Sequence, residues 1–148
     1  MKNNQMNEVE LKYNSGSISS KKITSVINAE NIMRKCYDPE TIDAYESFYC
    51  VFVDDDYTPK KYIKLSSGGV TAAIVDMRML FSAMIKSKVK KLIVAHNHPS
   101  GTLKFSQADL DLTNKIKECC NYLDFELLDH ILITSDNFSS MKSTHNNI

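Results

Sequence analysis

Three stretches of the chain repeat apolar residues every three to four positions, which is the spacing of one face of an α-helix. They begin after Ser25, Asp76 and Ser106, and the pair Asp38-Pro39 ends the first of them. Ser and Asp are favourable helix N-caps because their side-chain oxygens accept hydrogen bonds from free backbone amides in the first turn. We therefore predict three helices, whose expected buried faces are Ala29, Ile32, Met33 and Cys36, then Met77, Leu80, Phe81, Met84 and Ile85, and then Leu112, Ile116, Cys119, Cys120 and Leu123.

Other stretches are apolar at most positions, or alternate apolar with polar residues, and these patterns predict β-strands. An acidic turn from Asp54 to Asp56 joins two strands as a hairpin, and residues 66–69 (Ser-Ser-Gly-Gly) are expected to break the second. The predicted strands are residues 46–54, 60–65, 90–96 and 125–134, with shorter edge strands at 9–13 and 138–141. Helices that alternate with strands predict an α/β layered domain, and the hairpin makes its sheet mixed instead of purely parallel.

The length of 148 residues is that of a single domain. We expect a polar segment with a possible edge strand over residues 1–22, the folded domain over residues 23–143 and a flexible C-terminus over residues 144–148.

The formal net charge is zero, which disfavours strong non-specific binding to nucleic acid, because such binding needs a basic surface. The cysteines lie in apolar runs without a Cys-x-x-Cys pair, and no apolar run is long enough to span a membrane. A cytoplasmic protein with reduced core thiols and no membrane contact is therefore expected.

The stretch with the most distinctive chemistry is His96 to Gly101 (His-Asn-His-Pro-Ser-Gly), which is followed by Ser106 and Asp109. Side chains alternate faces along a strand, so His96 and His98 point the same way if the strand reaches them. The proline and glycine of this stretch stop the strand, and Asp109 lies one turn into the helix that Ser106 opens. Two imidazoles and one carboxylate that converge in this way can bind a divalent metal. Three protein ligands leave one position for water, which is typical of a catalytic zinc.

Each part of this stretch also has an interpretation without a metal. Buried histidines are often satisfied by hydrogen bonds, and Ser106 with Asp109 resembles a capping box, in which each side chain accepts from a backbone amide. The two interpretations are compatible, because Ser106 can cap the helix while Asp109 binds a metal. The same ligand set also occurs in the facial triad of non-haem iron oxygenases. Those folds are usually β-barrels, so the predicted helices disfavour that alternative.

A zinc-bound water needs a nearby carboxylate to take its proton, and Glu46 is the best candidate because it stands at the start of an apolar strand. The alternative interpretation of Glu46 is an ordinary surface acid at a strand end, and sequence spacing alone does not choose between the two. Asp129 and His130 form an adjacent pair in a buried strand, where the carboxylate could orient a ligand imidazole. For this pair we favour the structural interpretation, in which the two residues anchor a loop or cap the sheet through hydrogen bonds.

The spacing of the histidines, Ser106 and Asp109 matches the JAMM motif, and the form Asn-His-Pro-Ser-Gly resembles the RadC family of JAB/MPN-domain proteins. The resemblance covers most of the chain, including the strand that Glu46 opens. It implies a JAB/MPN fold with cytidine-deaminase-like layers, in which a mixed curved sheet carries helices on its faces and a zinc at one end. It also implies hydrolysis of a peptide or isopeptide bond. In the implied site, His96, His98 and Asp109 are the zinc ligands. Glu46 is the general acid/base, and Ser106 stabilises the oxyanion.

The resemblance implies a peptide or protein substrate with a scissile peptide or isopeptide bond. RadC-like proteins often carry an N-terminal helical segment associated with DNA binding. The residues before Glu46 are too few for such a segment, so strong direct DNA binding is not expected. The alternative function is a non-catalytic MPN scaffold or a DNA-processing accessory module, in keeping with the DNA-repair label of the family. The oligomeric state stays open, although the predicted edge strand at residues 9–13 could pair with another chain.

Overall fold

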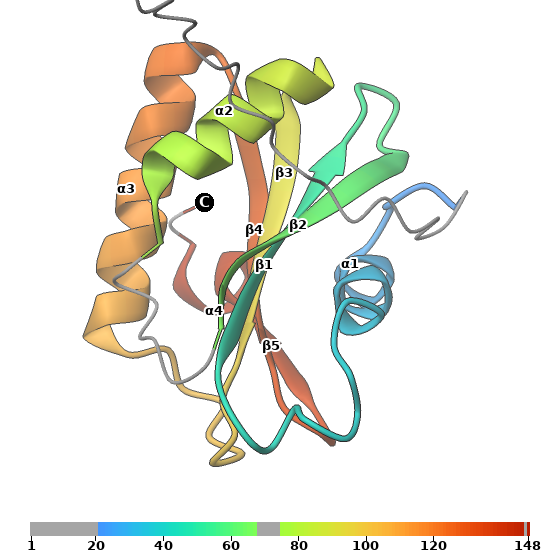
Figure 1. Ribbon diagram of the computed structural model, residues 1–148, viewed down its shortest axis with the longest axis vertical. Coiled ribbons are helices and arrows are strands. Elements are labelled where there is room, and N and C mark those ends of the chain that lie inside the picture. Colours follow the sequence, from blue (N-terminus) through green and yellow to red (C-terminus); the bar gives the residue numbers. More distant parts are fainter. Residues whose placement is uncertain (1–20, 68–74, 147) are drawn as a thin grey trace, which may run out of the picture.

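The computed structural model describes residues 21–67, 75–146 and 148, which form a five-stranded sheet with helices on both faces (Figure 1). In chain order the elements are α1 (Val26–Arg34), β1 (Ser47–Val53), β2 (Pro59–Ser67), α2 (Met77–Ser87), β3 (Lys91–Asn97), α3 (Gln107–Leu123), β4 (Glu126–Ile133), β5 (Phe138–Ser140) and α4 (Met141–His145). The predicted edge strand at residues 9–13 lies outside the described residues.

The sheet is mixed, and its strand order is β2-β1-β3-β4-β5. β1 pairs antiparallel with both β2 and β3, whereas β3 and β4 are parallel and β5 returns antiparallel to β4. The helix α3 joins the two parallel strands, since parallel neighbours need a long crossover connection. The prediction of an α/β domain with a mixed sheet is therefore confirmed.

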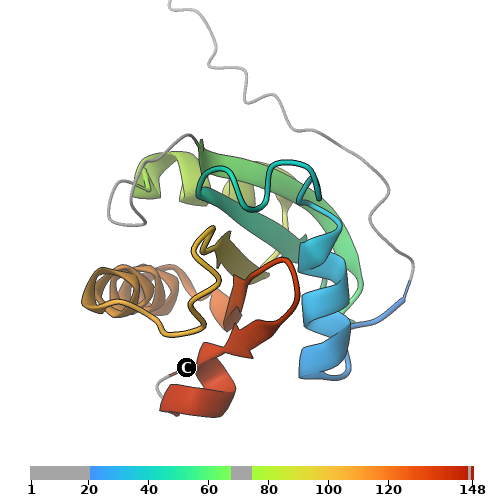
Figure 2. The ribbon, with the colours of Figure 1, turned by 90° about the horizontal axis from the view of Figure 1, so that it is seen from below.

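Helices α2 and α3 cover one face of the sheet, and α1 covers the other (Figures 1 and 2). Successive side chains of β3 alternate between these two faces. Leu92 and Val94 belong to the core under α2 and α3, whereas Ala95 belongs to the core under α1. The same alternation directs His96 toward α3 and Asn97 toward the opposite face. The side chains of the last two residues of β3 therefore lie on opposite faces of the sheet.

The predicted helical faces are correct except near the helix ends. α1 ends at Arg34, so Cys36 follows the helix and is only partly buried. Ile85 of α2 is 61% exposed, because Ala83 occupies the buried side in its place, and Leu123 at the end of α3 is 45% exposed. Apolar spacing alone cannot tell how far along a helix the core continues. In the part of the chain that the structure describes, no helix is both long and apolar enough to cross a membrane.

The ends of two elements also differ from the prediction. Ser66 and Ser67 do not break β2 but form its last two residues, paired with Phe48 and Ser47, so that part of the prediction is wrong. Backbone hydrogen bonds extend the ladder regardless of these small polar side chains, while the glycines that follow lie outside the described residues. The short helix α4 was not predicted, and it includes residues 144 and 145 of the segment expected to be flexible.

Candidate metal centre

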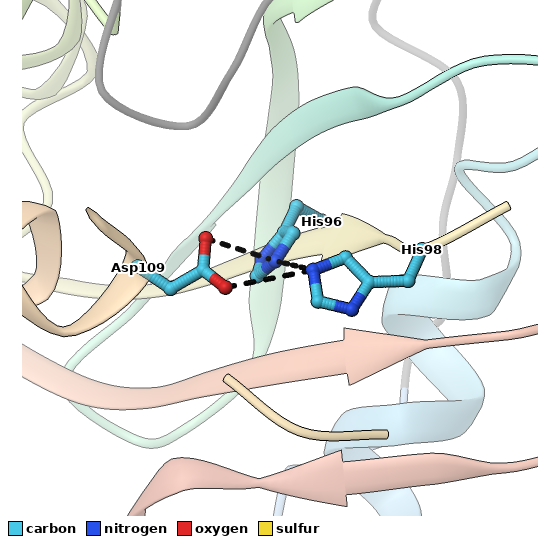
Figure 3. Close-up of side chains that lie close together, drawn as sticks. All are labelled: His96, His98 and Asp109. Atoms are coloured by element: carbon cyan, nitrogen blue, oxygen red, sulfur yellow. Dashed lines mark hydrogen bonds and ion pairs between the residues drawn. The ribbon is translucent and has the colours of Figure 1, made fainter. Parts of the chain in front are cut away.

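The structure brings the three predicted metal ligands together at the end of β3 (Figure 3). His96 is the penultimate residue of β3, His98 follows the strand, and Asp109 lies in the first turn of α3. The Nε2 atoms of the two histidines are 3.0 Å apart. Asp109 places Oδ1 3.3 Å from Nε2 of His96 and Oδ2 3.5 Å from Nε2 of His98. One ligand atom from each residue lies within 4.8 Å of the others, so the cluster can hold a metal ion.

These separations fit a tetrahedral metal site. Zinc binds imidazole nitrogen and carboxylate oxygen at about 2.0–2.1 Å, so two ligand atoms on a tetrahedron lie roughly 3.3 Å apart. The three measured separations, from 3.0 to 3.5 Å, lie on both sides of that value. His98 Nδ1 lies 2.8 Å from the carbonyl oxygen of Thr102, so Nδ1 carries the hydrogen and the neutral ring keeps a lone pair on Nε2. The chemistry and the spacing of the donor atoms therefore both suit zinc.

The segment between the histidines and Asp109 is fixed by backbone contacts. The amide of His98 donates to the carbonyl of Ile133 at 3.1 Å, and Gly101 closes a turn by donating to the carbonyl of His98. Gly101 has φ +80°, a conformation that favours glycine. Ser106 and Asp109 form a capping box, in which the Ser106 amide donates to Asp109 Oδ2 at 2.7 Å and the Asp109 amide donates to Ser106 Oγ at 3.1 Å. The helix cap thus orients the carboxylate that faces both histidines.

Interactions within the cluster keep Asp109 ionised. Burial by itself would raise the pKa of Asp109, but its interactions with the two imidazoles and the backbone amide of Ser106 hold that pKa well below its usual range. The protonated His98 ring can donate from Nε2 to Asp109, which raises the pKa of His98, although partial burial of the ring opposes that change. A divalent metal needs an ionised carboxylate and neutral imidazoles. Protons and metal therefore compete at His98.

Glu46 lies beside the cluster, immediately before β1. Its Oε1 is 3.9 Å from His98 Nε2, and its side chain is 33% exposed. The antiparallel register explains this proximity: Phe48 of β1 is opposite His96 of β3, so the residue two positions before Phe48 approaches the residue two positions after His96. Glu46 can thus reach both the candidate metal ligands and the solvent.

Asn97, between the two histidines, was not identified from the sequence as part of the site. Its side chain is 1% exposed and points to the opposite face of the sheet. Its Nδ2 donates to the carbonyls of Ile42 and Tyr45 at 2.7 and 2.9 Å, and its Oδ1 accepts from the Ser47 amide at 2.7 Å. Asn97 therefore holds the segment that presents Glu46. The only sequence signal was a second polar residue, next to His96, at the end of a mostly apolar strand.

Asp129 and His130 point in different directions and have different roles. Asp129 accepts hydrogen bonds from the Ser140 hydroxyl and the Lys142 amide, so it anchors the start of α4 as the structural interpretation predicted. That interpretation is wrong for His130, whose Nε2 lies 2.7 Å from Nδ1 of His96. The residue that contacts the imidazole of His96 is thus the histidine of the pair and not the carboxylate.

Aromatic rings enclose the buried side of the site. The ring of Phe48 is nearly parallel to that of His96, with centroids 6.1 Å apart and an angle of 10° between the planes. Phe48 and Phe105 also contact His130, at centroid distances of 5.5 and 5.4 Å. Burial of His130, which is 0% exposed, lowers the pKa of its ring well below the usual range. His130 is therefore a neutral imidazole in an apolar setting.

The comparisons with known proteins agree with this architecture. The chain matches the RadC-like JAB domain over residues 21–146. A UPF0758 protein of Flavobacterium johnsoniae is 38% identical over 120 residues, which cover 81% of this chain and 51% of the relative. A UPF0758 protein of Haemophilus ducreyi is 35% identical over 97 residues, or 66% of this chain and 44% of the relative, so the chain spans about half of these curated relatives or less. The chain belongs to the family of RadC-like JAB domains.

Proposed function

We propose that the protein is a zinc-dependent hydrolase of the JAMM type, which cleaves a peptide or isopeptide bond in a cytoplasmic peptide or protein. The observation that carries this proposal is that Glu46 lies 3.9 Å from His98, beside a cluster that can hold a metal ion. Three protein ligands leave a position for water, and a neighbouring carboxylate can accept the proton of that water. Membership of the RadC-like JAB family supports the proposal.

The ligand cluster and Glu46 divide the chemistry between them. Zinc held by His96, His98 and Asp109 would polarise a substrate carbonyl and lower the pKa of water. Glu46 takes the proton of the attacking water and delivers it to the leaving amine. Its partial exposure gives the carboxylate access to a substrate that enters from the solvent. Replacing Glu46 should therefore affect hydrolysis far more than metal binding.

Ser106 is suited to the substrate carbonyl oxygen. Its Oγ accepts a hydrogen bond from the Asp109 amide, which leaves the hydroxyl proton free for another partner. Ser106 is exposed, and it is held next to the ligand carboxylate by the capping box. A hydroxyl in this position can donate to the negative charge that develops on the oxygen when the carbonyl is attacked.

The proposal is tested with the zinc-loaded chain, a library of linear peptides and a set of peptides with a lysine isopeptide bond, and mass spectrometry to detect cleavage. We expect wild-type chain to cleave members of one set. Glu46→Gln should lower the rate about 10²–10⁴-fold, the range for loss of a general acid/base, while its zinc affinity changes little. Glu118→Gln, an exposed change on α3, is the control and should behave as wild type.

Two results would contradict the proposal. Cleavage by Glu46→Gln at the wild-type rate would remove Glu46 from the reaction. A protein that binds zinc stoichiometrically but cleaves neither peptide set would favour the non-catalytic scaffold or DNA-processing accessory role. In that case, DNA binding that weakens steeply with salt would support the accessory role.

A further inference from the structure

A continuous chain of buried hydrogen bonds runs from His96 into helix α3. His96 Nδ1 is 2.7 Å from His130 Nε2, and His130 Nδ1 is 2.6 Å from Thr113 Oγ1. Thr113 Oγ1 is in turn 2.7 Å from the backbone carbonyl oxygen of Asp109. The three side chains are each at most 2% exposed, so their polar atoms depend on one another and not on solvent.

The direction of each hydrogen bond follows from the Asp109 carbonyl. A carbonyl oxygen can only accept, so the Thr113 hydroxyl must donate its single proton to the carbonyl of Asp109. Thr113 Oγ1 can then only accept from His130, which requires the hydrogen of His130 to be on Nδ1. A neutral imidazole has one N–H group, and this leaves an unprotonated Nε2 on His130.

The same reasoning determines the tautomer of His96. The unprotonated Nε2 of His130 accepts, so His96 donates from Nδ1 and carries no hydrogen on Nε2. That Nε2 is the atom 3.3 Å from Asp109 Oδ1. His98 reaches the same state by a separate route, since its Nδ1 donates to the carbonyl of Thr102. The lone pairs of two Nε2 atoms then meet 3.0 Å apart, an arrangement that a cation between them stabilises.

We propose that Thr113 and His130 are positioning residues, which hold His96 in the tautomer that binds metal. The inference rests on the metal site of the proposed function and deepens it. Asp109 contributes at both ends of this chain, because its backbone carbonyl fixes the first hydrogen bond and its carboxylate is a ligand. A buried threonine hydroxyl that contacts no ligand atom thereby controls zinc affinity.

Two measurements on the whole chain test the inference. The first is ¹⁵N NMR of the metal-free protein, in which the nitrogen shifts report the tautomer of each of the four histidines. We expect a hydrogen on Nδ1 and none on Nε2 in both His96 and His130. The second is zinc affinity by competition with a chromogenic chelator. Thr113→Val, which keeps the shape but removes the hydroxyl, should weaken zinc binding about 10–100-fold, the usual range for the loss of a group that orients a metal ligand.

Matched variants separate this role from general stability. Thr113→Ser retains the hydroxyl and should bind zinc nearly as wild type does. Thr134→Val removes another buried hydroxyl, which contacts Asn137, and should leave the zinc affinity unchanged. Thr113→Val should also mix the His96 tautomers. Wild-type affinity in Thr113→Val, or a hydrogen on Nε2 of His96 in the wild type, would overturn the inference.

The inference and the proposed hydrolysis can fail separately. A protein with the expected tautomers and variant affinities that hydrolyses nothing would refute the hydrolase and retain the positioning role. An active hydrolase whose Thr113→Val variant binds zinc normally would refute the positioning role and retain the hydrolase. If Thr113→Val does not fold, the tautomers of His96 and His130 in the wild type alone test the positioning role.

Discussion

The side chain of Asn97 is hydrogen bonded to the backbone amide of Ser47, the residue directly after Glu46, at 2.7 Å. Asn97 also lies between His96 and His98 in the chain, on the opposite face of the sheet. One residue thus links the strand that carries two candidate metal ligands to the segment that carries the proposed general base. The two halves of the site are therefore held in register from the side of the sheet that faces away from the candidate metal site.

Asn97→Ala is expected to separate stability and hydrolysis from metal binding. Each buried backbone group that loses its partner costs roughly 1–3 kcal/mol, and Asn97 satisfies two such groups and a third that is partly buried. Displacement of Glu46 should lower hydrolysis at saturating zinc by up to about 100-fold. Zinc affinity should change little, because the ligands are oriented from the other face. Denaturant unfolding, peptide cleavage and chelator competition measure the three quantities.

The exposed Asn121→Ala on α3 is the matched control for Asn97 and should be neutral in all three assays. If Asn97→Ala instead lost zinc affinity in proportion to activity, Asn97 would support the histidines and not the segment of Glu46.

Zinc is expected to stabilise the folded chain strongly. An ion that binds only the native state at a free concentration of 1,000 times its Kd adds about 4 kcal/mol to the free energy of unfolding. Asp109→Asn removes a ligand charge and should abolish most of this gain, whereas Asp111→Asn on the exposed side of α3 should retain it. Thermal unfolding with buffered zinc and then with excess chelator provides the comparison. Equal shifts in the two variants would show that zinc binds elsewhere.

Zinc affinity should also depend on pH through His98. The metal needs the neutral ring, and the hydrogen bond to Asp109 raises the pKa of His98 above its ordinary 6.5. Below that raised pKa, the proton that competes with the ion at His98 should lower the affinity about tenfold per pH unit. Chelator competition from pH 5 to about pH 9 measures the profile. A midpoint below 6.5 would contradict the interaction between His98 and Asp109.

In the metal-free protein, the contribution of His98 to stability should fall as pH rises, whereas its effect on zinc affinity has the opposite dependence on pH. Since the folded pKa of His98 is raised, its contribution to stability is present below 6.5 and is lost as pH rises through the folded value. Asp109 has a lowered pKa, so its contribution is present above 3.8 and is lost as pH falls through its folded value. Denaturant unfolding of the chelator-treated chain should therefore show greatest stability between these limits, and a continued rise in stability above the folded pKa of His98 would contradict this.

Ser106→Ala tests whether the serine does more than cap its helix. Loss of an N-cap costs about 1 kcal/mol, and Ser25→Ala at the start of α1 should have the same effect on stability. Only Ser106→Ala should lower hydrolysis, by about 10²-fold if its hydroxyl donates to the developing oxyanion. Peptide cleavage at matched fractions of folded protein makes the comparison. Equal activity of the two variants would limit Ser106 to its capping role.

Local patterns determined much of the candidate site. The alternation of a strand placed His96 on the face that receives α3, and the capping box placed Asp109 at the start of that helix. These features depend on residues close together in the chain, whose backbone geometry is set by local hydrogen bonds and sterics. The sequence by itself therefore predicted the three candidate ligands, the helix caps and the mixed sheet.

Only the tertiary structure decided which distant residues complete the site. Antiparallel pairing of β1 with β3 brings Glu46 to His98, and parallel pairing of β3 with β4 brings His130 under His96. Strand pairing is made by backbone groups that every residue possesses, so local sequence contains little information about which strands meet. For this reason sequence spacing could not select Glu46 as the proposed general base, and the contributions of Asn97 and His130 became visible only in the folded sheet.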